Sequence, residues 1–203
     1  MKNIITAKHT LSILFLLWYS AQVFSQTISG QVRTETGSGI EEATVSVTGP
    51  GISLFDLTDN NGNFEFTGLP TGQSYELCVE LDNNPLNGVS TFDQVLLAKH
   101  ILHTELLDSP YKIIAGEVGG DNTPPDVLDL YITRQLILGV YTEFPSVPSW
   151  KFMRADFAFP DPVQPYSYPF PLGCKTMTLS GDATGQDFIG MKSADVNGNA
   201  VAH

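Results

Sequence analysis

The sequence predicts a mainly β protein with a small α-helical part: an antiparallel sandwich followed by a pair of loop–helix units. Apolar and polar residues alternate in five short stretches of the first half, the pattern expected of half-buried strands. Two later stretches instead carry apolar residues at helical spacing. A loop rich in oxygen-bearing side chains precedes each of these two stretches.

The first 26 residues are expected to be a secretory signal peptide that lies outside the fold. Lys2 and Lys8 flank the start, an apolar run covers 11–19, and small residues follow near Ser25. This order is typical of export signals, and the run is too short to span a bilayer of about 30 Å as a helix. An uncleaved N-terminal anchor is the alternative. Both interpretations predict a secreted or cell-surface protein.

The chain is strongly acidic, with 22 Asp and Glu against 10 Lys and Arg and a net charge of −12. Removal of the signal peptide takes away two lysines and no acid, so 8 basic residues oppose 22 acids and the net charge becomes −14. Such a surface repels nucleic acid and anionic lipid. It suits calcium, which prefers carboxylate and carbonyl oxygens. The rest of the chain offers no apolar stretch long enough to span a membrane.

Residues 27–80 are predicted to form a small sandwich of five antiparallel strands, spaced at intervals of about ten residues. The expected strands cover 27–34, 43–48, 52–58, 63–67 and 74–80. Glycine, asparagine and proline in the intervening segments supply the backbone angles of tight turns. The segment from Asp59 to Gly62 is expected to be a hairpin turn.

Four motifs in this part of the chain carry a family resemblance. They are Ser29-Gly30-Gln31-Val32, Ile40-Glu41-Glu42-Ala43-Thr44-Val45, Thr58-Asp59-Asn60-Asn61-Gly62-Asn63-Phe64 and Leu69-Pro70-Thr71-Gly72-Gln73-Ser74-Tyr75. Together they resemble the carboxypeptidase-regulatory-like and Cna-B-like families. The resemblance implies an immunoglobulin-like or prealbumin-like antiparallel sandwich. Such domains serve as spacers, adhesin modules and enzyme appendages, so the fold does not name an activity.

Residues 81–139 contain two predicted helices, over 93–103 and 129–139. Apolar residues in each fall on one helical face. Asp93 aligns with Asp129 at an offset of 36 residues, and the apolar residues that follow align as well. This offset indicates a tandem duplication of loop plus helix, in which each helix buries its apolar stripe against the other.

The loops before these helices contain candidate calcium ligands, because calcium loops place oxygen ligands on a tight turn closed by a carboxylate at a helix start. The first set is Asp82, Asn84, Asn87 and Asp93. The second set is Glu117, Asp121, Asp126 and Asp129. A half-sized third set is Asp195, Asn197 and Asn199, after which the sequence supplies no closing carboxylate. The alternative is that the loops are solvated turns in which the final aspartates cap the helices.

The tandem units resemble dockerin-type modules. The segment from Asn84 to Asp93 is similar to the version found beside regulatory-like sandwiches in large secreted bacterial surface proteins. Residues 188–192 and 195–199 are similar to the segment that closes that arrangement. The first loop departs from the pattern at Leu86, and the second departs at Gly119 and by one extra residue. The resemblance implies a docking module with calcium as its ion and a protein partner.

Residues 140–203 are expected to be a proline- and aromatic-rich extended segment that ends in the partial calcium-like loop. Prolines recur every few residues and disfavour helices. Five aromatic residues could stack on sugars or could simply pack over the sheets. These are Trp150, Phe157, Phe159, Tyr166 and Tyr168. Cys78 and Cys174 either form a disulfide or leave Cys78 as a small buried hydrophobe.

No nucleophile elbow, phosphate loop or HExxH motif occurs in the sequence, so the chain is expected not to be an enzyme. The expected function is that of a non-catalytic, calcium-stabilised structural and docking module in a larger cell-surface or polysaccharide-processing assembly. The alternative is a carbohydrate-binding accessory domain of a polysaccharide-degrading system. The expected partners are a protein and, in the alternative, a polysaccharide, with no nucleic acid and no stable membrane span.

Overall fold

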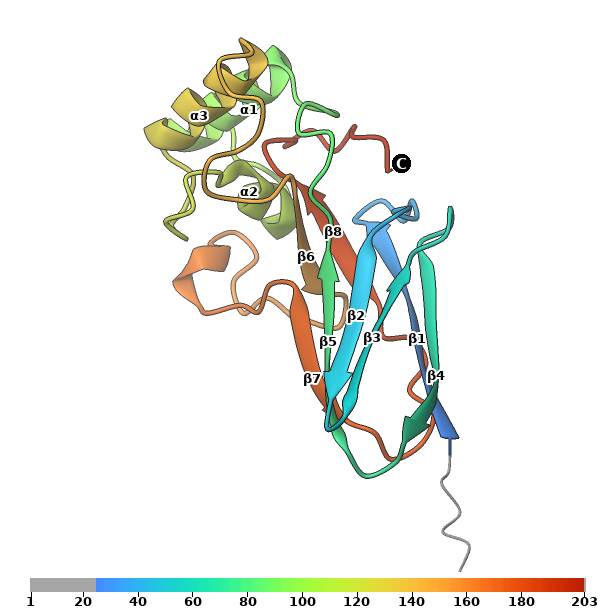
Figure 1. The fold of residues 1–203 in the computed structure, drawn as a ribbon. Helices are drawn as coiled ribbons and strands as arrows, with labels where there is room; N and C mark the ends of the chain where they lie inside the picture. The colour runs from blue at the N-terminus through green and yellow to red at the C-terminus, as the bar shows by residue number, and fades with distance from the viewer. Residues whose placement is uncertain (1–24, 203) are drawn as a thin grey trace, which may run out of the picture.

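The computed structural model describes residues 25–202 as a sandwich of two four-stranded sheets, with three helices gathered at one end (Figure 1). The strand order is β4-β1-β8-β6 in the first sheet and β3-β2-β5-β7 in the second. The predicted signal peptide lies outside the described residues, except that Ser25 and Gln26 begin β1. Within 25–202, no helix combines the length and the apolar character that crossing a bilayer requires.

The elements follow one another from strands to helices and back to strands. The first five strands are β1 (Ser25–Thr34), β2 (Thr44–Gly49), β3 (Ile52–Leu57), β4 (Asn63–Pro70) and β5 (Ser74–Glu80). The helices are α1 (Thr91–Ile101), α2 (Pro110–Gly116) and α3 (Val127–Ile137). The last strands are β6 (Trp150–Arg154), β7 (Cys174–Thr178) and β8 (Phe188–Lys192), with a 3-10 turn, η1 (Pro165–Ser167), between β6 and β7.

The five predicted strands of the first half are confirmed, and their alternation puts one face of each sheet into the core. Val45 and Val47 of β2 pair with Val79 and Leu77 of β5, and all four side chains are buried. Burial of each such side chain contributes roughly 1.5–3 kcal/mol to folding. The turn at Asp59 is present, since its carboxylate accepts hydrogen bonds from two turn N–H groups. It joins β3 to β4, which lie in different sheets, so it is not a hairpin turn.

The sandwich takes three further strands from residues 140–203, a part of the chain in which the sequence predicts extended segments and, within 187–199, one short apolar strand. β8 lies between β1 and β6 and runs parallel to β1, with Val32 beside Phe188. β7 extends the second sheet at β5. Phe188 is fully buried in the core formed by the first five strands. The sandwich therefore extends beyond the predicted boundary at residue 80.

Helices α1 and α3 have matching caps at both ends, as two copies of one loop–helix unit would. Ser90 and Asp126 are the N-cap residues, and a capping box with an aspartate at the third helical position follows in both. His103 and Gly139 follow the last turns with φ values of 55° and 69°. Equivalent backbone bonds close both C-termini, from Thr104 N to Lys99 O and from Val140 N to Gln135 O.

Candidate functional site: a loop divided between two parts of the chain

Asp93 lies in the first turn of α1 and is 1% exposed. Its Oδ2 atom accepts hydrogen bonds from Ser90 N and Ser90 Oγ, both at 2.9 Å. Its Oδ1 atom accepts three more, from Val196 N and Asn197 N at 3.1 Å and from Asn197 Nδ2 at 2.8 Å. The carboxylate therefore fastens the C-terminal segment to the start of α1.

The third candidate loop, residues 195–199, therefore has a closing carboxylate, which comes from a distant part of the sequence. Asp195 Oδ1 accepts from Gly198 N at 2.8 Å and from Asn199 N at 3.3 Å, and Asp195 Oδ2 accepts from Ala200 N at 2.8 Å. The residue that closes this loop is Asp93, which precedes Val196 by 103 positions. We call residues 195–199 together with Asp93 the split loop. Sequence reasoning missed this loop because it looked for the closing ligand only among neighbouring residues. The pairing of β8 places residues 195–199 beside Asp93, which is distant in the sequence.

The loop before α3 has the same arrangement in continuous sequence. Asp129 Oδ1 accepts from Val118 N at 2.7 Å and from Gly119 N at 2.8 Å, while Asp129 Oδ2 accepts from Asp126 N at 2.7 Å. Glu117 Oε1 accepts from Gly120 N, three residues on, as Asp195 does from Gly198 N. We call residues 117–129 the second loop. Both loops therefore deliver two successive N–H groups to the aspartate in the first turn of a helix.

A buried lysine forms an ion pair with one acid of the second loop, Glu117. Lys151 Nζ lies 3.0 Å from Glu117 Oε2, and both side chains are 5% exposed. The ammonium also donates to the backbone oxygens of Ile114 and Glu117. Burial, followed by the negative charge of Glu117, raises the pKa of the Asp129 carboxyl, and backbone hydrogen bonds oppose this rise. Loss of Lys151 would leave two buried acids without a compensating charge.

Two acids also share the split loop. Burial raises the pKa of Asp195, and the charge of Asp93 raises it further, while N–H groups from 198–200 lower it. The nearby ammonium of Lys192 donates to Asn83 O at 2.9 Å and lies 5.2 Å from the centre of the Trp150 ring. Burial lowers the pKa of Lys192 to about 8, against the opposing effect of Asp82 and Asp195.

The side chains of the other candidate ligands bond to different segments of the chain. Asp82 Oδ1 accepts from Ser149 N at 2.8 Å. Asn87 forms two hydrogen bonds with the backbone of Val201, and Asn84 adopts a left-handed turn conformation with φ 45°. Asp121 accepts from the N–H and hydroxyl of Thr123, and Asp126 accepts from Leu128 N. The first predicted ligand set is therefore not brought together around Asp93, which faces residues 195–197 instead.

The split loop offers the ligand types that calcium prefers, namely carboxylate and amide oxygens. However, both oxygens of Asp93 and both of Asp195 accept hydrogen bonds from protein donors. N–H groups direct positive charge at the same lone pairs that a cation would use. Calcium can therefore bind at Asp93 only if it displaces some of these donors.

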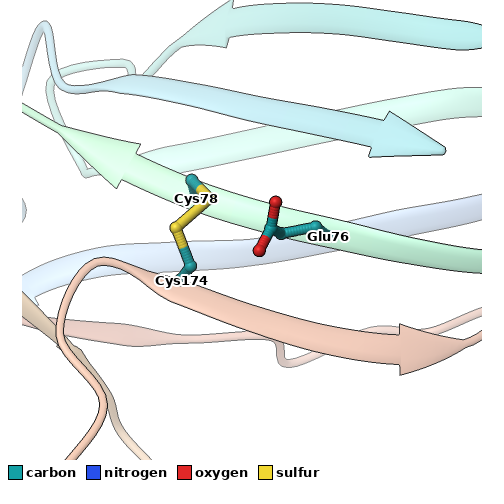
Figure 2. Close-up of side chains that lie close together, drawn as sticks. All are labelled: Glu76, Cys78 and Cys174. Carbon is teal, nitrogen blue, oxygen red and sulfur yellow. A yellow bond between two sulfur atoms is a disulfide. The ribbon is translucent and has the colours of Figure 1, made fainter.

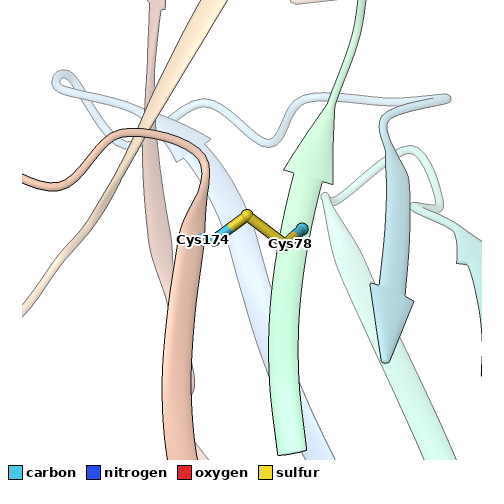
Figure 3. The surroundings of a disulfide bond; sticks show 2 residues. All are labelled: Cys78 and Cys174. Atoms are coloured by element: carbon cyan, nitrogen blue, oxygen red, sulfur yellow. A yellow bond between two sulfur atoms is a disulfide. The ribbon is translucent and has the colours of Figure 1, made fainter. Parts of the chain in front are cut away.

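Figure 2 shows Glu76 beside Cys78 and Cys174, the one group of three histidine, cysteine or carboxylate side chains whose ligand atoms lie close together among residues 25–202. The two sulfur atoms are bonded to each other, with the Cα atoms 4.1 Å apart (Figure 3). A disulfide sulfur is not a thiolate, so this group does not form a metal site. The bridge joins β5 to β7, which decides between the two roles expected for Cys78.

The aromatic residues of the last third pack mainly against one another. Trp150 is buried, and Phe159 makes edge contacts with Tyr111 and Phe157. Tyr166 packs edge-on against Phe170, and burial raises its pKa. Tyr168 is the exposed member of the predicted set. This arrangement agrees with aromatic packing over the sheet, and it leaves no row of exposed rings among the five.

Comparison with known families gives one match. Residues 27–86 match the Carboxypeptidase regulatory-like domain. The match covers β1 to β5 and the loop that follows, so the domain and its β-sandwich are shown for this part of the chain. It leaves out the three helices and the strands β6 to β8, although two of these strands extend the same sheets at β1 and β5. No curated protein sequence matches the chain.

Proposed function

We propose that the chain is a non-catalytic structural and docking module of a larger extracellular or cell-surface assembly, and that its helix pair binds a protein partner. The observation that carries the proposal is a matching row of exposed apolar side chains on α1 and on α3. The rows are Phe92, Val95 and Leu102, and Leu128, Tyr131 and Leu138. Each of the six is between 46% and 72% exposed.

The two rows occupy equivalent positions of the duplicated units, at the same offset that relates Asp93 to Asp129. The spacing of three and then seven residues keeps each row on one face of its helix. Exposed apolar residues that are grouped in this way mark interaction surfaces more often than single ones do. The acidic net charge of the chain disfavours nucleic acid and anionic lipid as the partner.

Calcium is part of this proposal, as the ion that stabilises the split loop. Its ligands would be Asp195, Asn197 and Asn199 from the C-terminal segment and Asp93 from α1. Two buried carboxylates close to each other favour a divalent cation, since the charge of Asp93 already raises the pKa of Asp195. In the second loop, Lys151 already supplies a compensating charge. The proposal therefore assigns calcium to the split loop first.

The test uses the full mature chain, immobilised through its N-terminus and exposed to proteins of the cell-surface fraction of the source organism. The double variant Phe92→Lys/Leu128→Lys changes one position in each row and leaves the caps untouched. A partner that the parent retains and this variant loses supports docking through the helix pair. A matched control is Val163→Lys, which changes an exposed apolar residue that lies on neither helix. Equal retention by parent and double variant would contradict the proposal.

Export is the remaining part of the proposal. N-terminal sequencing of the protein recovered outside the cell should place cleavage near Ser25, ahead of most of β1. Recovery of the chain from the cytoplasm with Met1 intact would contradict it.

A further inference from the structure

The two sheets have four edges, and three of them are protected against pairing with another chain. At β6, residues 150–153 are buried, and the ammonium of Lys151 donates a hydrogen bond to the backbone oxygen of Ile114 in α2. At β7, Lys175 places a charge on the edge and pairs with Asp156 at 3.2 Å. Exposed edge strands are commonly guarded by such covering elements and by lysine.

The β4 edge is guarded by its neighbour across the sandwich. Asp56 Oδ2 accepts a hydrogen bond from Glu65 N at 3.1 Å, so this outward N–H of β4 is already satisfied. Gly68, with φ 83°, and Pro70 then interrupt the regular edge. Proline and backbone irregularity are further devices that prevent strand addition.

Within the described part of the chain, the β3 edge lacks a covering element, a lysine and a break in its backbone, and its one charged residue, Asp56, is bonded to β4. Its six residues, Ile52–Leu57, pair with β2 without a register shift and include no lysine, arginine, proline or glycine. Leu54, Phe55 and Leu57 are 42%, 77% and 55% exposed. No segment within residues 25–202 pairs with the outer side of this strand.

The backbone of β3 offers free hydrogen-bonding groups along this outer side. Thr58 N donates to Ala43 O, which places Thr58 in a hydrogen-bonded pair with β2. In an antiparallel ladder the groups of successive residues point alternately toward and away from the partner strand. The N–H and C=O groups of Ser53, Phe55 and Leu57 therefore point away from β2.

The surroundings of this edge are acidic. A hollow of about 740 Å³ beside Leu57 is lined by Asp56, Asp59, Glu65 and Asp187 and by no basic residue. The neighbouring guanidinium of Arg33 forms a salt bridge of 3.7 Å with Asp187. It compensates the negative charge of Asp187 and leaves the other three acids without a basic partner among the residues that the structure describes. The edge therefore combines exposed apolar side chains with an excess of negative charge.

We infer that β3 is a docking edge for an extended segment of another protein, in which apolar residues alternate with lysine or arginine. Such a segment would add a strand to the β3-β2-β5-β7 sheet through the free groups of β3. Its apolar residues would cover Phe55 and Leu57, and its basic residues would face the acidic hollow. A second copy of this chain fits less well, because it carries the same net charge of −12.

The probe is a synthetic eight-residue peptide in which valine alternates with lysine, added to the full mature chain. Fluorescence anisotropy of the labelled peptide measures affinity, and amide hydrogen exchange locates the site. Binding should slow exchange at Ser53, Phe55 and Leu57. A peptide of the same sequence with alternate backbone nitrogens methylated should bind at least tenfold more weakly, since it cannot complete the ladder. A peptide with glutamate in place of lysine should not bind.

Two variants separate this edge from the helix surface. Phe55→Lys should weaken binding of the valine–lysine peptide at least tenfold, and Phe92→Lys on α1 should leave it unchanged. Thermal melting of both variants checks that each is folded. Equal affinity for the methylated peptide would show that the peptide binds without backbone hydrogen bonds to β3, and this result would overturn the inference. No binding at millimolar peptide, or concentration-dependent dimerisation of the chain through β3, would also overturn it.

Discussion

The side-chain Nε2 of Gln94 donates a hydrogen bond of 3.1 Å to the backbone oxygen of Leu130, and these residues hold equivalent positions in the duplicated helices. The exposed rows on α1 and α3 therefore belong to two helices that touch each other at matching positions of the repeat.

Asp93 should be one of the most sensitive positions for stability. Asp93→Ala leaves five donors without their acceptor in a buried site, so we expect a loss of about 3 kcal/mol or more in the free energy of unfolding. Asp93→Asn retains one carbonyl oxygen and should lose less. Urea denaturation measures both.

The matched control is Asp126→Ala, which removes one N-cap bond from α3 at an exposed site. Its cost should be about 1 kcal/mol. Equal costs for Asp93→Ala and Asp126→Ala would show that Asp93 acts only as a helix cap and does not fasten the C-terminal segment.

Calcium should raise the melting temperature more than magnesium does, because magnesium gives up its waters reluctantly. A hundredfold excess over Kd corresponds to about 2.7 kcal/mol of added stability. Asn199→Ala should reduce the calcium shift at little cost to the apo protein, since Asn199 is exposed. Melting in calcium, magnesium and chelator tests this. An identical melting temperature in calcium and chelator would mean that N–H donors alone hold the split loop.

Reduction of the Cys78–Cys174 bridge should destabilise the sandwich strongly. The bridge spans 96 residues, and a loop of that size corresponds to about 4–5 kcal/mol in the chain-entropy model. Urea unfolding with and without reductant measures the loss. The double variant Cys78→Ala/Cys174→Ala should match the reduced parent and should not respond to reductant. Two free thiols in the oxidised protein, detected by mass spectrometry after alkylation, would contradict the bridge.

Lys192 should titrate with a pKa of about 8, well below an ordinary lysine. The folded-state pKa is depressed, so between pH 8 and about 10.5 the unfolded chain binds more protons than the folded chain. This group therefore adds stability as pH rises through that window, and the contribution is absent below pH 8. NMR of the Lys192 side-chain carbons measures the pKa. Lys192→Met should reduce the rise in stability above pH 8, while Lys151, whose pKa is also lowered by burial, keeps its own share of that rise. A pKa near 10.5 would show that solvent reaches the ammonium.

Local pattern was sufficient for the first five strands and for α1 and α3, because alternation and helical spacing are read within a few residues. The helix α2 was missed, although Ser109 at its N-cap and Pro110 in its first turn are recognisable start signals. Its seven residues are too few for a periodic pattern to stand out.

The partners of β8 and of Asp93 could not be predicted in the same way. The residues of β8 have the apolar pattern of a strand, but nothing in Phe188–Lys192 indicates that this strand pairs with β1 or runs parallel to it. The closing carboxylate of the split loop was sought after Asn199 and lies far before it. Both depend on long-range packing, which no single stretch of sequence encodes.

The central place of β8 has a consequence for how the protein is made. A growing chain that has reached residue 180 has all the matched family domain and all three helices, yet β1 and β6 still lack the strand that joins them. Residues 195–199 emerge later still, so α1 is fastened after the sheet is complete. The first sheet can close only once residue 192 has been made, and a chain that stops before β8 leaves two bare strand edges available for aggregation.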